Sequence, residues 1–140
     1  MAREILFKAK RIDNGEWVEG LLWKKKYQSN KWYISCFPDK DDNEEVYVID
    51  SNTICQYTGL TDMNGNKIWE NDVCKVYLEI PFLQNKQKLV NDVGVVSFDV
   101  EESRYYINSI QGKQYALAFV TEVIGNIFDN PELLGGADNG

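Results

Sequence analysis

Carboxylates are the most numerous residues with catalytic potential in this chain of 140 residues. Two carboxylates held across a cleft can cleave a glycoside, and a cluster of them can bind a divalent metal. The candidates lie between residues 70 and 129: Glu70, Asp72, Asp99, Glu101, Glu102, Glu122 and Asp129. Spacing along β-strands does not define a distance across a cleft, so we interpret most of them as solubilising surface groups. A carboxylate- or metal-dependent enzyme is therefore the weakest of three functional hypotheses.

The cysteines offer little further chemistry. Cys36, Cys55 and Cys74 are far apart and lack the C-x-x-C spacing of zinc and redox sites. The chain contains no histidine, which removes the commonest metal ligand and the usual base that activates a cysteine nucleophile. We predict reduced thiols that pack as small apolar side chains, and a protein with no catalytic residue, metal or cofactor.

A segment rich in lysine and aromatic residues is the most suggestive candidate for a binding surface. Its members are Trp23, Lys24, Lys25, Lys26, Tyr27, Lys31 and Trp32. Aromatic rings between lysines can stack on bases while the lysines follow the phosphates, but such rings also pack the core of a small sheet. With 15 basic and 22 acidic residues, the chain has a net charge of −7 that repels phosphate at long range. Core packing is thus the preferred interpretation, and nucleic-acid binding by this interaction face is the alternative.

A turn-rich stretch at residues 56–73 contains residues that shape the backbone: Gly59, Asp62, Asn64, Gly65 and Asp72. The start at Asp62 superficially resembles a calcium loop, but Gly65 comes too early and the distal glutamate is missing. The Asn64-Gly65 pair predicts a type I′ hairpin turn, in which both central residues have positive φ. We expect Asp72 to accept hydrogen bonds from backbone N–H groups of its turn.

Short apolar-alternating segments separated by Gly, Asn and Asp indicate a mainly-β protein with little helix. The predicted strands cover a hairpin within 5–23, then 32–37, 46–49, 53–57, 73–78, 93–98, 105–107, 115–119 and 122–127. Residues 79–91 are predicted to form a variable loop, and Asn130-Pro131 predicts one terminal helical turn. An apolar fraction of 44% is sufficient for a core. The start lacks a signal peptide and no run approaches the ~20 apolar residues of a membrane span, which predicts a cytoplasmic protein with no membrane contact.

The order of these pieces resembles the YopX protein family of bacteriophages and prophages of low-GC Gram-positive bacteria. The resemblance rests on five blocks: 5–10, 17–20, 56–65, 68–73 and 123–134. It implies an SH3-type barrel over roughly residues 56–128 with an N-terminal β-hairpin or sheet extension, and no established activity or site residues. The expected domains are a β subdomain at 1–55 packed on the barrel, the barrel domain at 56–134 and a flexible tail at 135–140. At Asn71 the family more often has Gly.

The leading functional hypothesis is a non-enzymatic phage accessory protein that acts in the host bacterial cytoplasm through protein contacts. It is motivated by the missing catalytic chemistry together with many Trp and Tyr residues, which are enriched at interfaces. The expected partner is a phage or host protein, with self-association as a further expectation. Nucleic-acid binding by a small β-barrel is the second hypothesis.

Overall fold

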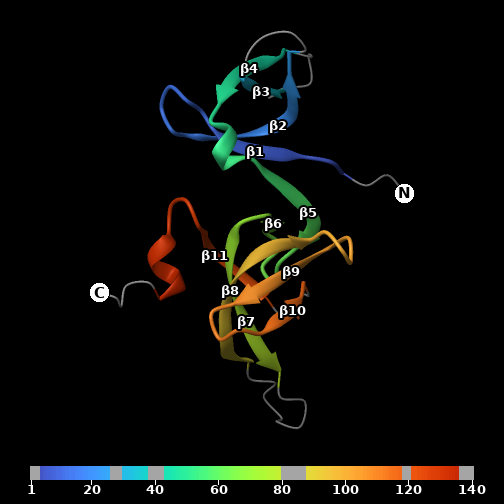
Figure 1. The fold of residues 1–140 in the computed structure, drawn as a ribbon, viewed down its shortest axis with the longest axis vertical. Coiled ribbons are helices and arrows are strands. Elements are labelled where there is room, and N and C mark those ends of the chain that lie inside the picture. The colour runs from blue at the N-terminus through green and yellow to red at the C-terminus, as the bar shows by residue number, and fades with distance from the viewer. Residues whose placement is uncertain (1–3, 26–29, 38–42, 80–87, 118–120, 136–140) are drawn as a thin grey trace. The chain divides into compact units, whose positions relative to one another are not determined.

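The computed structural model describes residues 4–25, 30–37, 43–79, 88–117 and 121–135 (Figure 1). The chain divides into two compact units, Met1–Tyr57 and Thr58–Gly140, which are called the N-terminal and C-terminal units below. Within the described ranges the regular elements are antiparallel β-strands and two short 3₁₀ helices, so the mainly-β prediction is confirmed. No helix among these residues is long and apolar enough to cross a membrane.

The N-terminal unit is a curled antiparallel sheet with the strand order β4-β3-β2-β1-β5. Its elements are β1 (Phe7–Lys10), β2 (Trp17–Lys24), β3 (Trp32–Cys36), β4 (Glu45–Ile49), the 3₁₀ helix η1 (Ser51–Thr53) and the start of β5 (Cys55–Thr61). The predicted hairpin is β1 and β2, whose turn contains Gly15 at φ +74°. The curl brings the end of β1 back to β4, because Arg11 and Ile49 form an isolated antiparallel bridge.

Alternation of side chains gives this sheet an inner and an outer face. The inner face carries the core, in which Ala9, Ile34 and Ile49 are at most 2% exposed. Neighbouring residues in each strand must then point to the outer face, and the register places Lys10 beside Trp17 and Trp23 beside Tyr33 there. The N-terminal sheet therefore has one apolar face and one face that combines aromatic and basic residues.

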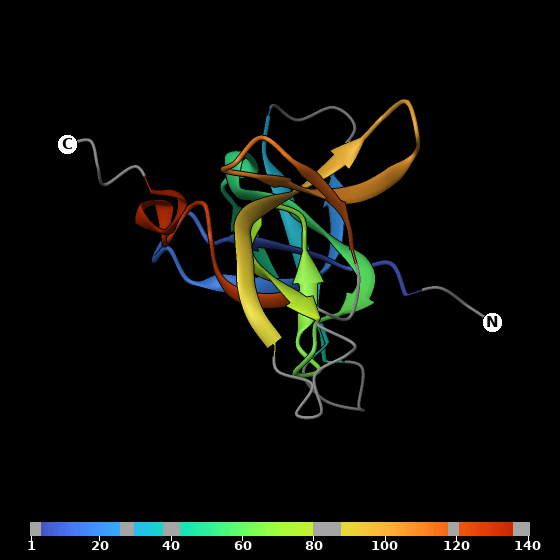
Figure 2. The same ribbon diagram turned by 90° about the horizontal axis from the view of Figure 1, so that it is seen from below.

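The C-terminal unit contains a five-stranded antiparallel sheet with the order β10-β9-β8-β7-β11. Its elements are β6 (Lys67–Trp69), which pairs with β5, then β7 (Asp72–Glu79), β8 (Lys88–Asp99), β9 (Arg104–Ser109), β10 (Gln114–Ala116), β11 (Thr121–Asn126) and the 3₁₀ helix η2 (Pro131–Leu134). Strand β8, drawn in yellow, bends along its length (Figure 2). The core consists of Ile68, Cys74, Val76, Val96 and Ile107.

Three details differ from the sequence expectations or lie beyond the described residues. The predicted loop 79–91 is shorter, because β7 continues to Glu79 and β8 already begins at Lys88. The predicted helical turn is η2, but Asn130 makes no side-chain cap and Gly135, expected in the tail, ends the helix at φ +78°. Residues 118–119 of a predicted strand and 136–140 of the predicted tail lie outside the described ranges.

The strand order of the C-terminal sheet runs from β10 to β11 without a described ladder that joins these two ends. Over the described ranges the sheet is thus open rather than a closed barrel. The SH3-type connectivity stays a prediction.

Candidate functional site

A pocket of about 530 Å³ opens on the surface of the N-terminal unit. It lies between the residues that follow β1 and the edge strand β4. Its lining residues are Arg11, Ile12, Asp13, Lys31, Val46, Tyr47 and Val48. This volume is within the usual range for binding pockets, and the lining combines apolar side chains with two cations and one carboxylate.

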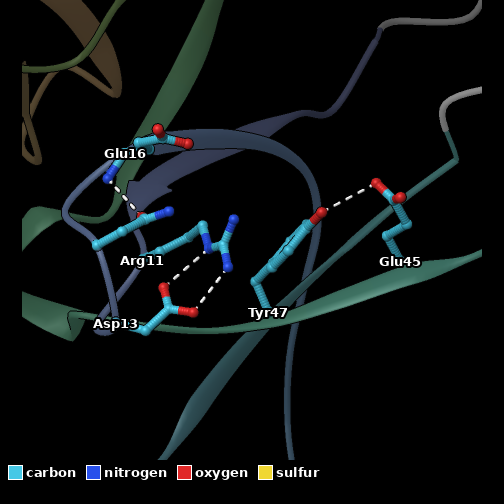
Figure 3. A network of polar contacts seen from close by, with 6 residues as sticks. Arg11, Asp13, Glu16, Glu45 and Tyr47 are labelled. Carbon is cyan, nitrogen blue, oxygen red and sulfur yellow. Dashed lines mark hydrogen bonds and ion pairs between the residues drawn. The ribbon is translucent and has the colours of Figure 1, made fainter.

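Arg11 is held in place from two sides (Figure 3). Its Nε and Nη2 donate to the two carboxylate oxygens of Asp13 at 2.9 and 2.7 Å, and its Cζ lies 4.3 Å from the centre of the Tyr47 ring. The hydrogen bonds from Arg11 lower the pKa of Asp13, and the same bonds raise the pKa of Arg11. Tyr47 is positioned in turn by its hydroxyl, which donates to Glu45 Oε1 at 2.9 Å and so has a raised pKa. The guanidinium therefore has a fixed position beside the pocket.

The pocket opens along a strand edge. Strand β4 is the last in the order of hydrogen-bonded strands. Among the described residues, backbone hydrogen bonds between this edge and the end of β1 run from Ile12 N to Val48 O at 3.1 Å and, just after β4, from Asp50 N to Lys10 O at 2.8 Å. Alternate residues of a strand direct their peptide groups to the same edge, so Val46 directs its N–H and C=O to the same side as Val48. Ile12 and Val46 are 63% and 45% exposed at this edge. The structure thus combines an accessible strand edge with exposed apolar side chains.

The predicted interaction face is divided between the two faces of the sheet. Trp23 stacks on Tyr33 with ring centres 4.4 Å apart, and the Lys25 Nζ lies 5.8 Å from the centre of the same Tyr33 ring. Lys24 instead lies over Trp32, which packs against the inner core. The other predicted members go elsewhere: Lys31 lines the pocket, while Lys26 and Tyr27 lie outside the described residues.

Sequence reasoning missed Lys8 and Lys10, which stand with Trp17 on the outer face. Their Nζ atoms lie 4.7 and 5.5 Å from the centre of the Trp17 ring. The sequence pattern could have indicated this arrangement. Lys8 and Lys10 are at alternate positions of a predicted strand, so both side chains must lie on the same face of the hairpin, together with every second residue of the partner strand. The outer face is therefore richer in cations than the predicted segment indicated.

Asp62 ties its turn to β11. One carboxylate oxygen accepts from the N–H groups of Asn64 and Asn66 at 2.9 Å each, and the other accepts from Val123 N at 2.9 Å. Burial acts to raise its pKa, but the three backbone hydrogen bonds outweigh burial and lower the pKa of the Asp62 carboxyl. This carboxylate is a structural acceptor in the folded C-terminal unit.

The type I′ prediction for Asn64-Gly65 is wrong. Gly65 has φ +82°, but Asn64 does not have a positive φ, and Gly65 N donates to Asp62 O at 3.0 Å. This is the pattern of a type I turn followed by a left-handed glycine. The Asp62 side chain explains the difference, because its hydrogen bonds to the Asn64 and Asn66 N–H groups hold the type I conformation.

The remaining turn residues also shape the backbone. Asp72 is 2% exposed and accepts from Trp69 N at 2.8 Å, and Gly59 has φ +89°. Asn71 has φ +73°, a left-handed conformation in which glycine is the least strained residue and asparagine the best-tolerated other one. The Asn found at this position is thus compatible with the turn.

Several of the candidate carboxylates accept hydrogen bonds from nearby groups. Glu122 accepts a hydrogen bond from the Tyr77 hydroxyl at 2.6 Å, and this bond raises the pKa of Tyr77. Glu122 also accepts from Asn64 Nδ2 at 3.3 Å. Asp99 accepts from the N–H groups of Glu101 and Glu102. Among the described residues no three Asp, Glu, Cys or His side chains gather as metal ligands.

The cysteines are free thiols, as predicted, and two of them are buried. Burial, together with the nearby Asp72 and Asp62, raises the pKa of Cys74 well above its ordinary range, and burial with Glu45 raises the pKa of the half-buried Cys36. Cys55 is 1% exposed. The surroundings of Cys36 and Cys74 therefore do not activate either thiol as a nucleophile.

We therefore expect Ellman's reagent at about pH 8 to modify only Cys36 in the folded protein, because Cys55 and Cys74 are buried, and to do so slowly, because the pKa of Cys36 is raised. Cys55 and Cys74 should react at the rate of unfolding. The same assay in concentrated guanidinium chloride should release all three equivalents. Rapid modification of Cys74 in native buffer would contradict the described burial.

Comparisons with known proteins agree with the fold and the motifs. The crystal structure of protein EF1440 from Enterococcus faecalis matches 95% of this chain and 99% of its own with a TM-score of 0.56 and 19% sequence identity, a likeness that concerns the fold alone. Comparison with curated proteins gives no match. The family model described as "YopX protein" matches residues 6–135. With nearly its whole length matched, the chain belongs to the YopX protein family.

Proposed function

We propose that this protein is a non-enzymatic interaction module that binds an extended peptide segment of a phage or host protein along the edge of β4. The observation that carries the proposal is the pocket at this edge, where an accessible strand meets exposed apolar side chains and the fixed guanidinium of Arg11. Its origin in a phage or prophage, and its action in the host cytoplasm, belong to the same proposal and rest on the family to which the chain belongs.

An extended peptide is the ligand that fits a strand edge. A peptide added to the sheet gains main-chain hydrogen bonds for affinity, while pockets beside the strand select alternate side chains. The N–H and C=O of Val46 provide a main-chain donor and acceptor, and Ile12 and Val46 provide apolar contacts. Peptide addition to β4 would therefore satisfy this edge and cover its exposed apolar area.

The charges at the pocket favour a peptide with an acidic residue. Arg11 and Lys31 supply two cations against the single carboxylate of Asp13. Arg11 is already held by Asp13 and stacked on Tyr47, so little side-chain entropy is lost when a ligand contacts it. Arginine and tyrosine are also the residue types that most often dominate interface energies.

Selection from a displayed library of random peptides tests the proposal. Wild type should enrich peptides in which apolar residues alternate and an acidic residue recurs. Val46→Pro should bind the enriched peptide about three- to tenfold more weakly, because it removes one edge N–H donor while the β3 ladder is kept. Val46→Thr is the matched control, since it keeps both the N–H and the shape of the side chain.

A second experiment tests whether the positive charge at the pocket contributes to binding of the acidic peptide. Lys31→Glu should weaken binding of the acidic peptide, whereas Lys24→Glu, the same change at an exposed lysine that does not line the pocket, should leave it within about twofold. The proposal is overturned if Val46→Pro and Val46→Thr bind alike. A light-scattering dimer that dissociates in Val46→Pro would assign the edge to a second copy of the chain instead.

A further inference from the structure

On the outer face of the N-terminal sheet, the described residues place lysines beside half-buried aromatic rings. Trp17 has the Nζ atoms of Lys8 and Lys10 at 4.7 and 5.5 Å from its ring centre. Tyr33 has the Nζ of Lys25 at 5.8 Å. The term outer platform is used below for these residues and the Trp23 that stacks on Tyr33: Lys8, Lys10, Trp17, Trp23, Lys25 and Tyr33.

The rings of the outer platform are held in position by the sheet. Trp23 and Tyr33 are cross-strand partners whose planes differ by 15°, and Trp23 Nε1 donates to Ser35 Oγ at 2.8 Å. Trp17 stands on the same side of the same strand, six residues before Trp23, which corresponds to about 20 Å along β2. Two aromatic sites at this separation can contact bases of one strand several nucleotides apart.

The charge of the N-terminal unit is compatible with a phosphate backbone. Residues 1–57 contain nine Lys and Arg against ten Asp and Glu, a net charge of −1, whereas residues 58–140 contain six against twelve, a net charge of −6. Among the described residues of the outer face, Glu19 lies opposite Lys8, and Glu44 accepts a hydrogen bond from the Ser35 hydroxyl. Most of the repulsive charge of the chain is thus carried by the C-terminal unit.

The lysines and rings of the platform can exchange partners when a nucleic acid binds. A base that stacks on Trp17 or on the Trp23–Tyr33 pair displaces an ammonium group, which is then free to contact the adjacent phosphate. Stacking a base on an aromatic ring contributes more than a cation–π contact at an exposed site, and the new ion pair releases counterions. The exchange therefore favours binding over the unbound arrangement.

We propose that the outer platform binds single-stranded nucleic acid without sequence preference. Trp17 and the Trp23–Tyr33 pair stack bases, and Lys8, Lys10 and Lys25 follow the phosphates. This site shares no residue with the pocket at β4 and goes beyond the proposed peptide binding.

Fluorescence anisotropy with a labelled oligothymidylate of about twelve nucleotides tests the proposal. Wild type should bind at about 50 mM salt and more weakly at about 200 mM. Trp17→Ala should weaken binding roughly five- to a hundredfold through the lost stacking, whereas Trp17→Phe, which keeps a ring, should bind more tightly than Trp17→Ala. Lys10→Glu should weaken binding and reduce the salt slope by about one.

Lys113→Glu supplies the matched control, because it makes the same charge change at an exposed lysine of the C-terminal unit. It should change affinity less than about twofold, and Val46→Pro should bind the oligonucleotide as wild type does. The proposal is overturned if wild type fails to bind at about 50 mM salt, or if Lys113→Glu weakens binding as much as Lys10→Glu. It is also overturned if a duplex of equal length binds more tightly than the single strand.

Discussion

Asp62→Ala should destabilise the C-terminal unit by about 3 kcal/mol, because it leaves three backbone N–H groups without their carboxylate acceptor. The donors on Asn64 and Asn66 belong to exposed residues and can bind water instead. Val123 is partly buried in β11, so its N–H cannot turn fully to water. The loss of its hydrogen bond to Asp62 therefore accounts for most of the destabilisation and also releases the turn from the sheet. Urea denaturation followed by far-ultraviolet circular dichroism measures the effect.

The exposed Asp129 provides the control for this substitution, and Asp129→Ala should cost less than about 1 kcal/mol. The pH dependence gives a second readout. Since the pKa of Asp62 is lowered on folding, its contribution is complete above the ordinary pKa of about 4 and is lost as the pH falls below it. Asp62→Ala should therefore lose less stability than wild type between about pH 5 and pH 2. Equal acid sensitivity of the two proteins would show that Asp62 is not the carboxylate responsible.

The turn at Asp62 shows what a sequence pattern predicts and where it fails. Alternation and turn residues predict the strands on either side, because these are local properties. The pair Asn64-Gly65 alone indicates type I′, but Asp at the first and Gly at the fourth position of a turn are typical of type I. The wider pattern, with Asp62 and Gly65 in those places, predicts the observed turn. The remaining bond, to Val123, joins residues 61 positions apart and has no local signal.

The candidate sites show the same limit. Alternation along β2 requires Trp23 and Lys24 to point to opposite faces, so a single interaction face containing both is incompatible with a strand. The pocket could not be predicted in this way, because Arg11 meets Tyr47 only after the sheet curls and bridges Arg11 to Ile49. The predicted bounds of β7 and β8 are too short for another reason. Polar residues at 84–88 interrupt the apolar pattern, so the sequence predicts that β7 ends too early and that β8 begins too late.

Gly20→Ala should destabilise the N-terminal unit by about 3 kcal/mol or more through a collision between β2 and β3. A Cβ at Gly20 would lie 2.1 Å from the Ser35 carbonyl oxygen and 2.9 Å from its carbon, both backbone atoms, and 3.1 Å from Ile34 Cγ2. Relief requires the two strands to separate, which breaks the register of Leu21 with Ser35 beside the core residue Ile34. Tryptophan fluorescence during urea denaturation reports on this unit, because three of the four tryptophans lie within residues 1–57.

Gly15→Ala separates this collision from the general cost of replacing a glycine. A Cβ at Gly15 meets no atom within 4 Å, but φ is +74°, so alanine there is strained by the backbone alone and should cost about 1–2 kcal/mol. The expected order of stability is wild type, then Gly15→Ala, then Gly20→Ala. If Gly20→Ala were as stable as Gly15→Ala, β2 and β3 could not approach as closely as described, and the cross-strand pairing of Trp23 with Tyr33 on the outer platform would lose its basis.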